Sequence, residues 1–362
     1  MSRLSRLIGG RKRLKFIAAG ALAVMIILAG RATQPEFDEQ TWLRQTKSYD
    51  ISLLYADHAD ENGKFFNPWL ARPSLFTLAV RKIFAKSYKT PDFPIENYRH
   101  IENSYEYLSD SANSISFVGH ASFIIKLDGA TIFLDPLLSD RAGLALKEVK
   151  IPFNFDKVPQ NPVVLISHNH YDHLDTQTIN ALIKKKAVFI AGLNMGGYFQ
   201  DLGAKKIYEL DWFQSVTIDK VTYTFLPAQH WSLRAGQGVD STLWGGFLIE
   251  GSKTIYFSGD SGYFRGFEEF GRCYLIDYAL IGVGAYEPRW FMHYQHLNVN
   301  EFFLAAKELN AKVAIPMHLG VIRLGDEHTL YPLHDITSRV KDDEALSKRV
   351  KVMRVGEYFI IE

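Results

Sequence analysis

The stretch Ser167-His168-Asn169-His170-Tyr171-Asp172-His173-Leu174-Asp175 places three imidazoles and two carboxylates within nine residues. The apolar run Val163–Ile166 stands directly before it, and such a run ended by a polar cluster is typical of a buried strand followed by a loop. Neutral imidazole and carboxylate are the ligands that zinc and similar metals prefer. A single histidine after a strand is more often structural, but this many groups would be costly to crowd together without a cation. The stretch therefore predicts a metal site at the end of a strand.

Three later polar residues also follow apolar, β-rich runs. His230, Asp260 and His318 each lie within four residues of the end of such a run. Each residue alone is weak support for a site. Together with the first stretch, however, four predicted strand ends each offer histidine or aspartate, which a random core would rarely produce.

From about residue 115 onward, the sequence pattern is typical of short strands. The first three are predicted at 115–118, 122–126 and 131–134, separated by Gly119-His120 and by Asp128-Gly129, which is a hairpin signal. Further strands are predicted at 163–166, 188–190, 215–218, 221–226, 244–249, 254–257, 278–281, 312–315 and 358–361, and helices at 176–186, 299–309 and 335–347. Two β-rich halves with interspersed helices predict an α/β fold in which two sheets pack face to face and helices cover them.

The spacing of histidines and aspartates over 168–173, with the three later positions, resembles the metallo-β-lactamase superfamily. The resemblance covers roughly residues 110–362 and implies a four-layer αβ/βα sandwich with metals at one edge. We therefore expect the hydrolase domain over residues 111–362.

Several strings resemble, more narrowly, the N-acyl-phosphatidylethanolamine-hydrolysing phospholipase D family. They are 67–69, 119–122, 227–231, 284–292 and 294–296. The nine-residue string over 284–292 is the specific one, because the superfamily motif alone would not choose a substrate.

This resemblance implies two zinc ions per chain and seven ligands: His168, His170 and His230 for one ion, Asp172, His173 and His318 for the other, and Asp260 as a bridge between them. Asp172 is then also a catalytic residue. Coordination by two zinc ions lowers the pKa of water, so a bridging hydroxide is nucleophilic near neutral pH.

Four further residues match the family strings around this centre. His296 matches a motif histidine near the leaving group, which implies a general acid or a donor to the phosphate, with a structural role as the alternative. His120 is expected to contact the substrate, to support the ligands or to contribute packing. Tyr286 and Arg289 are expected substrate contacts, although an internal ion pair of Arg289 with Glu287 is an equal alternative.

Composition narrows the choice of partner. The chain has 362 residues, 47% of them apolar, and a formal charge of +1. This near-neutral balance argues against nucleic acid as the main partner. A single cysteine, Cys273, excludes a disulfide within the chain. A homodimer is one oligomeric state that the sequence leaves open.

The N-terminus carries a membrane signal. Six basic residues and no acid occur in residues 1–15, and the uncharged apolar run 16–30 follows. This pattern predicts an uncleaved membrane anchor or a cleaved signal peptide over residues 1–30, with residues 31–110 as a linker and N-terminal helical extension. Because basic ends stay in the cytoplasm, the catalytic body is expected on the non-cytoplasmic side, either at a bacterial inner membrane or secreted after cleavage.

The leading hypothesis is thus a zinc-dependent phosphodiesterase of the phospholipase D type that acts on N-acyl-phosphatidylethanolamine-like lipids at a membrane. Two alternatives are a metal-dependent hydrolase of another ester, such as a lactone or small phosphodiester, and a non-catalytic metal-binding envelope protein. The complete ligand set argues against the non-catalytic alternative.

Overall fold

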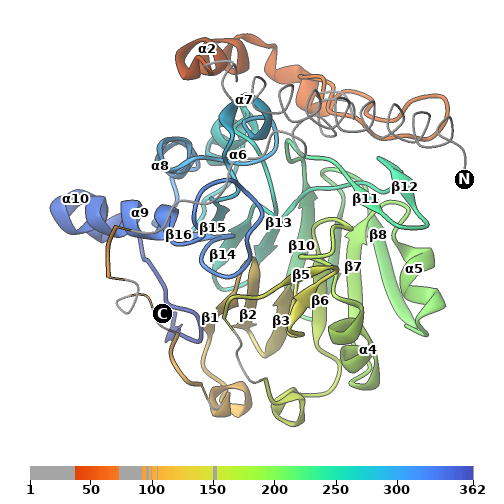
Figure 1. Ribbon diagram of the computed structural model, residues 1–362. Coiled ribbons are helices and arrows are strands. Elements are labelled where there is room, and N and C mark those ends of the chain that lie inside the picture. Colours follow the sequence, from red (N-terminus) through yellow and green to blue (C-terminus); the bar gives the residue numbers. More distant parts are fainter. Residues whose placement is uncertain are drawn as a thin grey trace, which may run out of the picture.

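Two β-sheets form the centre of the computed structural model, which describes residues 37–72, 92–94, 98, 100–103, 105–149 and 153–361 (Figure 1). Within these residues the first sheet has the strand order β17 (Tyr358–Ile360), β1 (Ser114–Gly119), β2 (Ser122–Leu127), β3 (Ala130–Leu134), β6 (Val163–Ile166), β7 (Val188–Gly192), β8 (Lys206–Leu210). The second has the order β16 (Val313–Met317), β15 (Tyr278–Gly282), β14 (Thr254–Phe257), β13 (Gly246–Glu250), β10 (Val221–Leu226), β9 (Ser215–Ile218). Two small hairpins are β4 (Arg141–Ala142) with β5 (Ala145–Leu146), and β11 (Leu233–Arg234) with β12 (Gly238–Val239).

Strand direction explains why polar residues far apart in the sequence meet. In the first sheet β3, β6 and β7 pair in parallel, and β1 and β3 are both antiparallel to β2. In the second, β14, β15 and β16 pair in parallel, and β10 and β14 are both antiparallel to β13. The carboxyl ends of the parallel strands therefore share one edge in each sheet. The His318 N–H donates to the His120 carbonyl at 2.8 Å, so these two edges lie side by side.

Helices cover the outer faces of the sheets. The helices are α2 (Glu39–Ser48), α4 (Thr176–Lys184), α5 (Gly196–Asp201), α6 (Gly266–Cys273), α7 (Arg289–Met292), α8 (Val299–Glu308), α9 (Tyr331–Asp342) and α10 (Glu344–Arg349), with 3₁₀ turns η1 (Ile51–Tyr55), η3 (Glu106–Ser109) and η4 (Phe155–Lys157). Helices α4 and α5 belong to the first sheet, and α6, α8, α9 and α10 to the second (Figure 1). Between the sheets lies one continuous apolar core, in which residues such as Phe123, Ile190 and Phe247 are completely buried. The predicted α/β arrangement of two sheets covered by helices is confirmed.

Residues 37–72 pack against this body. Trp42 of α2 donates from its indole to Glu301 of α8 at 3.1 Å. Asn67 accepts from the Trp244 indole at 3.1 Å and donates to the Tyr294 hydroxyl at 3.0 Å. These buried hydrogen bonds fix the segment across the helices and strands of the second sheet.

Some predictions differ from the structure or fall outside it. The single helix expected over 335–347 is two helices, because the Asp343 side chain ends α9 and accepts from the first amides of α10. The apolar segment 16–30 lies outside the described residues, as do parts of the region 31–110 that follows it. Among the helices that are described, none is both long and apolar enough to cross a bilayer.

Candidate metal centre

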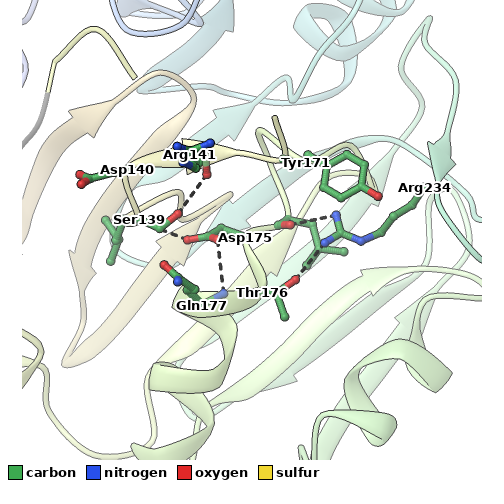
Figure 2. A pocket seen from close by; sticks show the side chains of 11 residues that line it. Ser139, Asp140, Arg141, Tyr171, Asp175, Thr176, Gln177 and Arg234 are labelled. Atoms are coloured by element: carbon green, nitrogen blue, oxygen red, sulfur yellow. Dashed lines mark hydrogen bonds between the residues drawn. The ribbon is translucent and has the colours of Figure 1, made fainter. Parts of the chain in front are cut away.

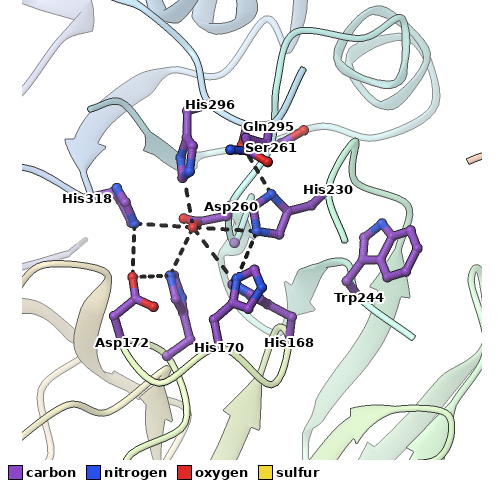
Figure 3. A network of polar contacts seen from close by, with 12 residues as sticks. His168, His170, Asp172, His230, Trp244, Asp260, Ser261, Gln295, His296 and His318 are labelled. Atoms are coloured by element: carbon purple, nitrogen blue, oxygen red, sulfur yellow. Dashed lines mark hydrogen bonds and ion pairs between the residues drawn. The ribbon is translucent and has the colours of Figure 1, made fainter. Parts of the chain in front are cut away.

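The loop after β6 carries the first ligand candidates. It runs from Ser167 to Asp175, whose carboxylate accepts from the backbone N–H groups of Gln177 and Thr178 and so caps α4. Asp175 is therefore engaged in helix capping, while the histidines before it point into the edge shared by the two sheets (Figure 3).

Three imidazoles form a first set. His168 Nε2 lies 2.8 Å from His170 Nδ1, and His230 Nε2 lies 3.2 Å from the same atom. Nitrogen ligands of a tetrahedral zinc, each about 2.0–2.1 Å from the metal, lie about 3.3 Å from one another. The spacing of these three rings is thus close to that of ligands around one metal ion, and each ring is buried or half-buried.

A carboxylate and two imidazoles form a second set. Asp172 Oδ2 lies 3.4 Å from both His173 Nε2 and His318 Nε2. Asp260 Oδ2 lies 3.2 Å from the same two nitrogens, and 4.0 and 3.8 Å from Nε2 of His168 and His230 in the first set. The Asp260 oxygen therefore stands between the two sets (Figure 3).

Unpaired polar atoms indicate that a cation belongs here. The buried atoms Asp260 Oδ1, His173 Nε2 and His318 Nε2 make no hydrogen bond within the described part of the chain. Buried polar atoms normally have partners, and a cluster left without them is costly. These donor atoms, which zinc and similar ions accept, fit bound metal.

The two sets differ in charge. Burial lowers the pKa of His168 and His230 well below the usual value, so these rings are neutral and present free lone pairs. Burial also opposes charge at His318, but the nearby carboxylates of Asp260 and Asp172 raise its pKa to about 9. The protons on the second set balance the two carboxylates, and metal would displace them.

Supporting residues hold the ligands in place. The Asp135 carboxylate, at the end of β3, lies 2.6 Å from His173 Nδ1 and accepts from the Ser167 N–H at 2.7 Å. His120, at the end of β1, bonds through Nε2 to Asp172 Oδ2 at 2.9 Å. Sequence reasoning missed Asp135, although it follows a predicted strand as the ligands do. His120 lies where a supporting residue was expected.

Arg234 holds the ligand loop from its outer side, and it was also missed. Its guanidinium donates to the carbonyls of Asn169 and Leu174 at 3.2 and 3.0 Å, and lies over the Tyr171 ring. Figure 2 shows this arrangement in an open depression of about 670 Å³ beside the loop. No sequence motif marks Arg234, because its role depends on the β11–β12 hairpin reaching the loop.

The other expected residues lie at different distances from the centre. His296 borders it, with Nδ1 3.9 Å from Asp260 Oδ2. Arg289 does not pair with Glu287, which instead accepts from the Arg289 backbone N–H, and its guanidinium pairs with carboxylates of α2 and α8. Tyr286 is half-buried, and its N–H donates to Glu327 at 2.9 Å.

An aromatic cavity lies beside the first set. Its volume is about 410 Å³ and His230 forms part of its wall. The other walls include Phe65, Phe66, Trp244 and Tyr294. The Arg72–Asp240 ion pair also lines this cavity, so the centre has a neighbour with aromatic and charged walls that is large enough for part of an amphiphilic molecule.

The fold and the ligand set define a metal-dependent hydrolase with the metallo-β-lactamase fold. The family model described as "Beta-lactamase superfamily domain" matches residues 130–319, and the chain belongs to this superfamily.

Within it, the chain is similar to N-acyl-phosphatidylethanolamine-hydrolysing phospholipases D. It is 28% identical to phospholipase D 1 of this kind from Caenorhabditis elegans over 75% of this chain and 83% of the relative. It is 30% identical to the mitochondrial enzyme from Saccharomyces cerevisiae over 60% of this chain, but spans only 49% of that relative. A metallo hydrolase structure from Ignicoccus hospitalis, 22% identical, superposes with a TM-score of 0.53 over 69% of this chain and 99% of the other, which supports the fold.

Proposed function

We propose that this protein is a dinuclear zinc phosphodiesterase of the phospholipase D type. Its substrates are N-acyl-phosphatidylethanolamine-like lipids, and water cleaves the phosphodiester on the head-group side. The products are a phosphatidic acid and an N-acylethanolamine-like alcohol. The observation that carries the proposal is the Asp260 oxygen between two ligand sets, because paired metal sites that share a carboxylate suit phosphodiester hydrolysis.

The roles of the residues follow from their positions. His168, His170 and His230 would hold one zinc ion, and Asp172, His173 and His318 the other, with Asp260 shared. When bound, two such ions would activate water near neutral pH and offset charge on the phosphoryl oxygens.

His296 would act on the substrate from the rim of the centre. Burial lowers the pKa of His296 to about 3, so its ring is neutral at physiological pH and still carries one N–H. Of the two expected roles, a donor to a phosphoryl oxygen therefore fits better than a general acid.

The lipid substrate is supported by two independent features. The aromatic cavity beside His230 offers apolar walls close to the metal ligands. The relatives from worm and yeast bear the names of lipid-cleaving enzymes. We further propose that the chain is membrane-bound through residues 16–30, with its body on the non-cytoplasmic face.

A lipid panel read by mass spectrometry tests this function. The metal-loaded protein should release phosphatidic acid from N-acyl-phosphatidylethanolamine, and an Asp260→Ala variant should release none. Turnover of lactones or small phosphodiesters with no lipid hydrolysis would favour the alternative hydrolase. Absence of all turnover in a zinc-loaded protein would favour a non-catalytic metal-binding protein.

A further inference from the structure

Helix α2, far from the metal ligands in the sequence, is connected to the rim of the metal centre through Arg289. Glu39 in its first turn accepts from Arg289 Nε at 2.6 Å and from Nη2 at 3.1 Å. From the other side of the same guanidinium, Nη1 donates to the His296 carbonyl at 3.3 Å. One side chain thus joins the N-terminal extension to the histidine beside Asp260.

Four of the five N–H groups of the Arg289 guanidinium are already engaged within the protein, which leaves one on Nη1 for any other partner. Besides Glu39, its Nη2 bonds to Glu301 at 2.7 Å, and the ring of Phe37 lies 5.3 Å from its guanidinium carbon. Its side chain is only 9% exposed. A guanidinium surrounded by two carboxylates, a carbonyl and an aromatic ring serves to fix geometry, because its planar fork holds several partners in set directions.

The His296 ring depends on its backbone for orientation. Its side chain has no hydrogen bond in the described structure, and the nearest carboxylate oxygen, Asp260 Oδ2, is 3.9 Å away. The backbone N–H of His296 donates to the carbonyl of Met292, which is the last residue of α7. This helix begins at Arg289. The His296 ring also packs against the rings of His230 and His318, whose centroids are 5.5 and 5.1 Å away, so its position depends on these two rings and on the segment that Arg289 holds.

Glu301 alone cannot replace Glu39 in this arrangement. The Glu301 carboxylate is shared, because it also accepts from the Trp42 indole at 3.1 Å and from the Asn298 N–H at 2.9 Å. Glu39 supplies two of the four polar contacts of the Arg289 guanidinium. Its loss would leave a buried cation with half of its partners.

We infer that Glu39 and Arg289 are positioning residues, through which the N-terminal extension sets the orientation of His296 toward the substrate phosphate. The expected effect of these residues on turnover rests on the proposed function. Their expected effect on the orientation of the His296 ring does not. The N-terminal extension thereby becomes part of the catalytic unit rather than a tether alone.

A double-mutant cycle tests the inference. Glu39→Ala should lower kcat about 10-fold with little change in KM, because small displacements of an active-site group are costly. In a His296→Ala background, itself about 100-fold slower, the same change should cost less than about 2-fold, since residues that act as one unit are not additive. Glu39→Gln, which keeps one acceptor for Arg289, should restore most of the turnover.

The matched control is Lys47→Met. Lys47 also joins α2 to α8, through Glu308 at 2.9 Å, but does not contact Arg289. This variant removes another ion pair between α2 and α8 and should leave kcat unchanged. Equal losses in Lys47→Met and Glu39→Ala, or full additivity with His296→Ala, would overturn the inference.

Histidine NMR of the zinc-loaded protein gives a readout independent of activity. The His296 ring signals, assigned by their absence in His296→Ala, should move in Glu39→Ala and stay in place in Lys47→Met. Unmoved signals in Glu39→Ala would refute the positioning role whatever the substrate. Moved signals in a protein without lipid hydrolysis would refute the proposed substrate and support the positioning role.

Discussion

Asp260 is the residue on which both ligand sets depend. Its Oδ2 atom lies 3.2 Å from His173 and His318, and 3.8 Å from His230. Burial raises the pKa of the Asp260 carboxyl group. The neighbouring His173 and His318 lower it by more, so the pKa lies well below the usual value. Asp260 is therefore ionised and able to contribute one negative charge that two bound cations would share.

Removal of Asp260 should empty the centre. We expect about two zinc ions per chain in the unchanged protein, and fewer than one with nearly no turnover in Asp260→Ala. Elemental analysis after dialysis against buffered zinc measures the zinc content, and an assay of lipid hydrolysis measures turnover. Full turnover by a metal-free Asp260→Ala protein would contradict a dinuclear mechanism.

Asp135 should tune metal affinity without touching the metal. It is completely buried and bonds to His173 Nδ1, which fixes the ring so that Nε2 faces the centre. Asp135→Asn should therefore weaken zinc binding about 10- to 100-fold, as loss of such supporting partners does. Competition with a zinc chelator measures the change. Asp128→Asn, at a turn where the carboxylate bonds to Ser252, should bind zinc normally.

The candidate ligands, which the structure brings together, could be proposed from the sequence more easily than the residues that support them. His230, Asp260 and His318 each follow an apolar run, so their types and their places were enough. Asp135 follows a run too, but an Asp-Pro pair after a strand is also an ordinary turn. Arg234 gives no sequence signal, since its partners are backbone carbonyls of a loop that only folding brings near.

At the scale of elements, we expect the contact between α2 and the end of α7 to depend on pH. His293 after α7 stacks on Phe37 at 4.3 Å and meets Trp42 edge-on at 4.4 Å. Burial lowers the pKa of His293 to about 4, from a usual value of 6.5. The folded protein therefore holds this ring neutral, while the unfolded chain protonates it below pH 6.5.

Stability should consequently fall as pH drops from 6.5 toward 4. The unfolded state binds the extra proton, so a loss of about 2 kcal/mol is expected over this window. His293→Phe keeps the aromatic contact and removes the titration, and its unfolding free energy should show a shallower pH dependence. Denaturant unfolding of both zinc-loaded proteins between pH 7.5 and 4.5 gives the comparison. Parallel curves would show that His293 does not titrate in this way.

Most strands near the centre could be predicted, and several other elements could not. The strands before the ligands are buried on both faces, so they read as continuous apolar runs. Strand β8 is an edge strand with mostly exposed side chains, and α6 contains glycines within its helical pattern. Both depend on tertiary packing, which a local pattern does not contain.

At the scale of the whole molecule, strand direction explains the location of the centre. Ligands and their supporting residues follow β1, β3, β6, β10, β14 and β16, whose carboxyl ends come together where the two sheets meet. Hydrogen bonds between the sheets, such as Gly245 N–H to the Ser167 carbonyl at 3.0 Å, fix that edge. The two sheets must therefore be docked correctly before either ligand set is complete.

The last prediction concerns the basic and apolar N-terminus. Only eight residues separate Gly30 from Glu39, and a fully extended chain between these two positions spans at most about 30 Å. If residues 16–30 lie in the bilayer, the rim of the metal centre is held near the lipid surface. In that case the positive-inside rule would place the body on the non-cytoplasmic face.

Deletion of residues 1–31 should therefore release a soluble and active enzyme. The truncated chain keeps Phe37, Glu39 and Trp42, so the contacts of α2 with Arg289 and Glu301 remain. Its activity on dispersed lipid should match that of the intact chain, because the metal centre and the α2 contacts are unchanged, while its activity on intact membranes should fall. Fractionation of cells expressing either form, with protease added to spheroplasts, measures location and sidedness. An intact chain in the soluble cytoplasmic fraction would refute the membrane location, and a shortened soluble form outside the cytoplasm would replace the anchor by a cleaved signal.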